Sequence, residues 1–188
     1  MSNFKTKGLI IKIGKIKEKD FLYTIYSYDY GIIKANKKLN KSHTWWKLLD
    51  LWYIINFEII TKEYSSIHKI KNIQILSEFS YENKSFNEIN NYLILLNTVA
   101  KKIPLWTENY EIFEIFEVIN SEKKINETSL ILANLKIISL IWELRIEHAD
   151  KTVLKILNFI HLNKITKIIK LVWIDEKIKK VLAGLAGI

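Results

Sequence analysis

The 188-residue chain has no cysteine, one proline (Pro104), one arginine (Arg145) and five glycines. The absence of cysteine excludes disulfide bonds, thiolate zinc sites and thiol chemistry. The dispersed glycines do not form a phosphate-cradling loop, and no Walker loop, dinucleotide fingerprint or nucleophile elbow is present. We therefore expect a protein that is not an enzyme and that needs no cofactor.

Long apolar runs are also missing. No stretch of about 18 uncharged apolar residues occurs, so we expect no membrane-spanning segment. The first 20 residues lack the apolar core and cleavage site of a signal peptide, and we expect a cytoplasmic protein. Four glutamates recur at three-residue spacing, which is typical of the solvated face of a helix and predicts no metal site: Glu108, Glu111, Glu114 and Glu117.

Positive charge is what the chain has in excess, with a formal net charge of +9. Residues 1–80 hold 14 lysines and 7 acidic residues, whereas residues 81–188 hold 15 basic and 13 acidic residues. This concentration in the first part favours a polyanionic partner. Codon bias in an AT-rich genome is an alternative source of the many lysines.

The first 76 residues carry the pattern of five strands. Apolar and β-branched runs predict strands over residues 7–16, 21–28, 32–36, 49–61 and 67–76. Gly8 and Gly14 indicate bulges or a barrel bend, and Gly31 indicates a tight turn with positive φ. Five strands in this length are typical of a small Greek-key barrel such as the OB-fold.

After residue 84, apolar residues recur at three- and four-residue steps, as they do on one face of a helix. Ser85 and Glu88 form a capping box, and Asp150, Asn163 and Asp175 are plausible helix N-caps. The sequence thus predicts an α+β protein: an N-terminal five-stranded OB-fold barrel (1–80), followed by an α-helical domain (81–188).

Lysines and tryptophans beside the predicted strand ends are the candidate site. Phosphates attract such lysines by counterion release, and bases stack on exposed aromatic rings. The alternatives are a solvated rim for the lysines and core packing for the aromatics, including Tyr23, Tyr26, Tyr28 and Tyr30. The candidate DNA-binding residues are Lys15, Lys17, Lys34, Lys37, Lys38, Lys41, Trp45 and Trp46.

Residues 6–42, TKGLIIKIGKIKEKDFLYTIYSYDYGIIKANKKLNKS, resemble the opening of the bacterial DNA repair protein RecO family. The segments LLDLWY (48–53) and IQILSE (73–78) are similar to its fourth and fifth strands. The chain departs from the family in its shortness, in lacking the four-cysteine zinc site of many members, and in lacking a glycine within Ala35–Lys38.

The resemblance implies an OB-fold that binds single- and double-stranded DNA, and a helical domain. It implies RecR and the acidic tail of single-stranded DNA-binding protein as partners. It also implies strand annealing and assistance of RecA loading in recombinational DNA repair, with the family's basic loop falling on Lys34, Lys37, Lys38 and Lys41. Two alternatives stay open: a helical protein-interaction module, and an RNA-binding OB-fold protein.

Overall fold

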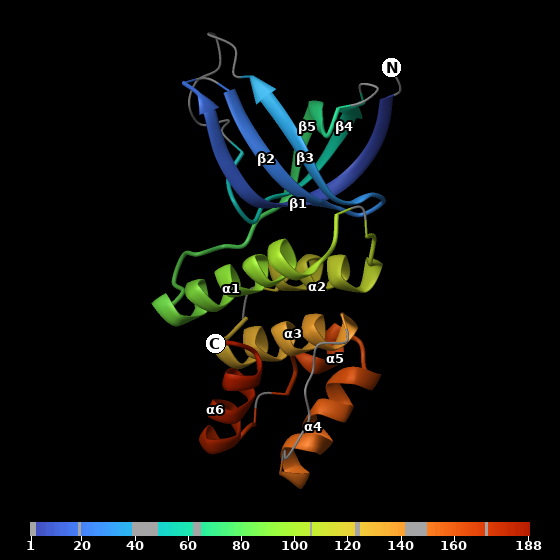
Figure 1. Ribbon diagram of the computed structural model, residues 1–188. Helices are drawn as coiled ribbons and strands as arrows, with labels where there is room; N and C mark the ends of the chain where they lie inside the picture. The colour runs from blue at the N-terminus through green and yellow to red at the C-terminus, as the bar shows by residue number, and fades with distance from the viewer. Residues whose placement is uncertain are drawn as a thin grey trace. The chain divides into compact units, whose positions relative to one another are not determined.

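The computed structural model (Figure 1) describes residues 3–18, 20–38, 49–61, 65–105, 107–122, 125–141, 150–171 and 173–188. Within these ranges the strands are β1 (Asn3–Lys17), β2 (Asp20–Ser27), β3 (Gly31–Lys38), β4 (Ile54–Ile60) and β5 (Ile67–Ser77). The helices are α1 (Phe86–Lys102), α2 (Tyr110–Ser121), α3 (Glu127–Leu140), α4 (Lys151–Leu162), α5 (Ile165–Ile168) and α6 (Glu176–Leu185). The predicted α+β class, with strands first and helices after, is confirmed.

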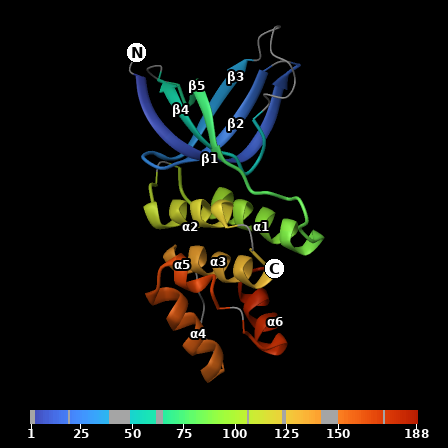
Figure 2. The ribbon, with the colours of Figure 1, turned by 180° about the vertical axis from the view of Figure 1, so that it is seen from behind.

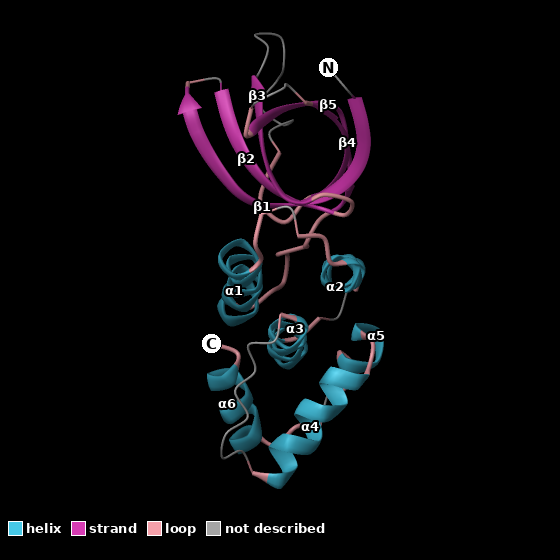
Figure 3. Cartoon of the chain, turned by 45° about the vertical axis from the view of Figure 1, so that its right-hand side comes forward, coloured by secondary structure: helices cyan, strands magenta, loops and turns pink. Residues whose placement is uncertain are grey.

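The five strands form a closed barrel in the order β1-β2-β3-β5-β4. The first half of β1 pairs with β4 and its second half with β2, while β3 and β5 pair in parallel. Figure 3 shows the strands wrapping around a common axis, and Figure 2 shows β4 and β5 from behind. This is the arrangement expected for an OB-fold barrel.

Glycine lets β1 bend between its two partners. Gly8 pairs with Ser27 of β2 and with Ile55 of β4. A Cβ at this position would lie 2.5 Å from Cγ2 of Ile25 and 3.1 Å from the Phe57 ring. The close approach therefore requires glycine, as the predicted barrel bend implied.

Alternate residues of the strands fill the barrel. In β2, Tyr23 and Ile25 are fully buried and pack with Ile33 and Ala35 of β3. The expected strand over 49–61 begins too early, because Trp52 has a φ of 62°, outside the extended region. The observed strand, β4, begins at Ile54.

The chain divides into two compact units that interleave in sequence. The barrel unit is Met1–Phe79 with Ile103–Glu117, and the helical unit is Ser80–Lys102 with Val118–Ile188. The sequence-based division at 80/81 lies next to the first break, whereas the return of residues 103–117 to the barrel was not expected. In that segment, Leu105 forms a β-bridge with Ile32, and the Tyr26 hydroxyl donates to the Asn109 carbonyl at 2.9 Å.

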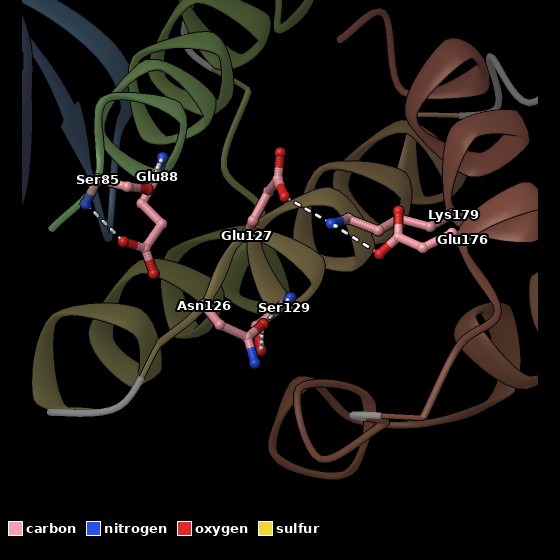
Figure 4. Close-up of polar contacts among 7 residues, drawn as sticks. All are labelled: Ser85, Glu88, Asn126, Glu127, Ser129, Glu176 and Lys179. Carbon is pink, nitrogen blue, oxygen red and sulfur yellow. Dashed lines mark hydrogen bonds and ion pairs between the residues drawn. The ribbon is translucent and has the colours of Figure 1, made fainter.

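Helix α3 is the centre of the helical unit, since residues 129–139 are all buried. It contacts α1, α4, α5 and α6. The predicted capping box is confirmed: the Ser85 backbone N–H donates to Glu88 Oε2 at 2.7 Å, and the Glu88 N–H donates to Ser85 Oγ at 3.2 Å (Figure 4).

Two of the three predicted N-caps are also confirmed. Asp150 accepts from the Thr152 backbone N–H, and Asp175 accepts from the Lys177 N–H. Asn163 was predicted wrongly, because it ends α4 as its C-cap and Lys164 precedes α5.

Candidate nucleic-acid interface

The predicted lysines of β1 and β3 meet at one end of a three-stranded sheet. Strand register aligns Lys17, Asp20 and Lys38 in one row and Lys15, Phe21 and Lys37 in the next. In Figure 1 the end of β1, the start of β2 and the end of β3 lie together at the upper left. β3 continues through Lys38, so Lys37 and Lys38 belong to the strand rather than to the loop after it.

Side-chain alternation divides these lysines between the two faces of the sheet. Phe21 packs against the barrel core, so its neighbours Lys15 and Lys37 project from the same, inward face. Lys17 and Lys38 lie opposite Asp20 and project from the outward face. The sequence predicted these lysines only as neighbours of the strand ends, whereas the structure puts them on both faces of the strands.

The outward face gains a further row of lysines closer to the middle of the sheet. Lys12 and Lys34 flank Thr24 of β2 in register. Because neighbouring strands lie about 4.8 Å apart, the two lysine backbones are separated by about 10 Å. Lys12, Lys34 and Lys38 are exposed, and none of the three forms an ion pair with a described residue.

Parallel pairing of β3 with β5 adds Lys69, which lies opposite Asn36. Lys69 is exposed and also belongs to the outward face, since its neighbours His68 and Ile70 are buried. Sequence reasoning missed this residue because it lies more than 30 positions beyond Asn36. We define the outward lysine face as Lys12, Lys17, Lys34, Lys38 and Lys69.

Two other barrel lysines, Lys5 and Lys71, differ because they share an acidic neighbour. Glu58 of β4 lies 3.5 Å from the Lys71 ammonium and 4.0 Å from that of Lys5. A hydrogen bond from the Asn72 side chain, and then the charge of Lys71, lower the pKa of Glu58. In the aligned rows of the outward face, by contrast, Asp20 lies between Lys17 and Lys38, and the residue between Lys12 and Lys34 is the uncharged Thr24.

The tyrosines of β2 and of the turn after it pack against other barrel-unit residues rather than lie on the lysine face. Tyr23 lies inside the barrel, and Tyr26 is buried against residues 103–117. Tyr28 is half-buried and packs on Tyr110, with ring centroids 4.7 Å apart. Tyr23 and Tyr26 are therefore core residues. This is the alternative that the sequence left open for these aromatics.

Three candidate site residues, Lys41, Trp45 and Trp46, lie outside the described residues. Within the described ranges, no cluster of three or more histidine, aspartate or glutamate side chains is arranged to hold a metal ion. Of the helices described, none has both the length and the apolar run needed to cross a bilayer.

No family model matches the chain, and no curated protein matches it. The geometry of the barrel and the resemblance in residues 6–78 are therefore the two features that bear on function.

Proposed function

We propose that this protein is a non-enzymatic DNA-binding mediator that binds single strands on the outward lysine face of its barrel. The observation that carries the proposal is the pair of rows formed by Lys12 and Lys34 and by Lys17 and Lys38, which cross β1, β2 and β3. OB-fold proteins bind oligonucleotides on the face of strands 2 and 3. The exposed ammonium groups are available to replace the counterions of a phosphate backbone.

Annealing follows from the same surface. A lysine face that neutralises phosphates without covering base edges lowers the repulsion between two strands and leaves their bases free to pair. The resemblance to the RecO family extends the proposal to recombinational repair. In that role RecR and the acidic tail of single-stranded DNA-binding protein are the partners, and RecA loading is the step assisted.

The test is a salt titration of binding to a fluorescent single-stranded oligonucleotide. The triple variant Lys12→Glu, Lys34→Glu, Lys38→Glu should bind roughly 10- to 100-fold more weakly at about 0.1 M salt. With alanine in place of glutamate, the slope of log K against log salt should become shallower by about 0.7 per lysine.

A matched control removes as much charge from the helical unit. Lys151→Glu, Lys155→Glu and Lys164→Glu change three exposed lysines that are not in the barrel. If this control weakens binding as much as the barrel variant, net charge alone governs binding and the assigned face is wrong. Stronger competition by a matched RNA strand than by the same DNA strand would favour the RNA-binding alternative, whereas equal competition is expected of a face that contacts phosphates common to both polymers.

A second candidate, a protein-interaction module, is favoured by Trp173 of the helical unit, whose side chain is 99% exposed. Large exposed aromatics of this kind are common anchors at protein interfaces. Failure of the intact protein to bind any nucleic acid, together with Trp173-dependent capture of a RecR or tail-peptide partner, would favour this candidate over DNA binding.

A further inference from the structure

The barrel contains an open cavity of about 200 Å³ that the lysine face does not use. Its walls come from β1, the β2–β3 turn, β3, the end of β4 and β5. The lining residues are Phe4, Tyr30, Ile33, Ile59, Thr61 and His68. The surface that lines the pocket is apolar, so the polar atoms of Thr61 and His68 do not face it.

Its size matches one planar ring. An apolar protein cavity of about 150 Å³ holds a benzene molecule, so this volume accommodates one aromatic ring. The Phe4 side chain is 41% exposed, and its ring lies 5.9 Å from the Tyr30 ring at an angle of 57°. Phe4 thus offers a ring surface to both the cavity and the solvent, as a stacking partner must.

Positive charge lies beside the cavity. Two lining residues on different strands are each followed directly by an exposed lysine of the outward lysine face: Ile33 by Lys34, and His68 by Lys69. Phe4 is followed by Lys5, which lies 4.0 Å from Glu58. Strand alternation points the lining residue inward and the lysine outward. An occupant with a ring inside and negative charge outside satisfies both surfaces.

We propose that this pocket receives one unstacked nucleobase of a single strand whose phosphates contact Lys34 and Lys69. The inference rests on the proposed function and deepens it, because it assigns a place to the base as well as to the backbone. A base in this pocket leaves the stack of its own strand, and its removal from water adds to phosphate binding.

The test compares two strands of about 16 nucleotides, one of oligothymidine and one with the same sugars and phosphates but no bases. The wild type should bind oligothymidine more tightly. Phe4→Ala should weaken oligothymidine binding about tenfold and leave binding of the baseless strand and its salt slope unchanged. Phe4→Leu keeps apolar volume but lacks the ring, so most of the loss should remain.

Phe86→Ala is the matched control, since it removes an 81% exposed phenyl ring from the helical unit and should change neither affinity. Thermal unfolding of each variant establishes that the barrel is intact. If Phe4→Ala weakens both strands equally or neither, the pocket inference is overturned while the lysine face stands. If the wild type shows no salt-sensitive binding to either strand, the proposed function fails and the pocket assignment fails with it.

Discussion

The ammonium group of Lys7 in β1 lies 2.6 Å from Oε1 of Glu117 in α2. The same nitrogen lies 4.4 Å from the centre of the Tyr28 ring and 5.2 Å from that of Phe113. The ion pair and the cation–π contact to Phe113 thus join the first strand to a segment more than 100 residues later, and the contact to Tyr28 adds the turn after β2. This cluster holds residues 110–117 within the barrel unit.

Removing the Lys7 charge should destabilise the barrel unit. Lys7→Met keeps most of the aliphatic stem, but loses one partly exposed ion pair and its cation–π contacts. Together these are worth about 1 kcal/mol. Urea unfolding should show that loss, whereas Lys155→Met, at an exposed position of α4, should unfold like the wild type. Equal stability of the two variants would mean that the Lys7 cluster contributes nothing.

Gly31 should not tolerate a side chain. Its φ is +63°, and an added Cβ would lie 2.5 Å from the Thr107 carbonyl oxygen. Gly31→Ala should therefore lower the free energy of unfolding by more than about 1 kcal/mol, through backbone strain and through displacement of residues 103–109.

The matched control for this change is Gly184→Ala in α6, where a Cβ would meet nothing within 4 Å. Alanine is a better helix former, so this variant should be up to about 1 kcal/mol more stable than the wild type. Denaturant melts of the two variants should move in opposite directions. A neutral Gly31→Ala would refute the close approach of residue 31 to Thr107.

Burial raises the pKa of the Tyr23 hydroxyl to about 12, with a smaller contribution from the charge of Asp50. An unfolded tyrosine ionises at a pKa of about 10. The stability linked to neutral Tyr23 is thus fully present below pH 10 and is lost as the pH rises toward about 12. Tyr23→Phe should reduce this alkaline loss.

Unfolding by urea at about pH 8 and about pH 11 measures the effect. The Tyr23 oxygen is buried and has no hydrogen-bond partner among the described residues, so phenylalanine should be tolerated at the lower pH. An unchanged loss of stability between the two pH values would show that other tyrosines, such as Tyr26 with its raised pKa, account for the alkaline sensitivity.

The Lys179 side chain of α6 forms ion pairs with two carboxylates of the helical unit, one on α3 and one on α6 itself. Its ammonium lies 2.6 Å from Glu127 at the start of α3 and 3.6 Å from Glu176 (Figure 4). The hydrogen bond to Glu127 is the main cause that raises the pKa of Lys179. The stability it contributes is present below pH 10.5 and is lost as the pH rises through the raised pKa.

Lys179→Met should therefore destabilise the helical unit near neutral pH, and the difference from the wild type should shrink at high pH. Exchange of the α6 amide hydrogens reports on this unit directly. Lys180→Met, at an exposed neighbouring position, is the control and should exchange like the wild type. A difference that stays constant with pH would indicate lost packing of the stem rather than a lost charge.

Several local features were predictable because neighbouring residues determine them. The apolar runs predicted five strands in their observed order, and the Ser85–Glu88 capping box marked the start of α1. The positive φ of Gly31 was predicted from its place in a short turn. Strand ends were less accurate, because β1 and β3 extend as far as their pairing partners allow, which a single segment does not reveal.

The face on which each lysine lies was decided by tertiary structure. Ile10 and Lys12 would share a face in a regular strand, but a register shift between them turns Lys12 outward. A second shift, between Lys15 and Lys17, separates those two residues as well. Such bulges depend on how a strand fits its neighbours, so period-two reasoning does not find them.

By itself, the sequence determined which segments extend, which coil into helices and where positive charge is abundant, because these depend on residues close together in the chain. Only the folded barrel decided that Lys69 lies beside Asn36, that six residues from separate segments line one open cavity, and that residues 103–117 pack with the strands. Those relationships join positions tens of residues apart, and they arise from closing a twisted sheet on itself.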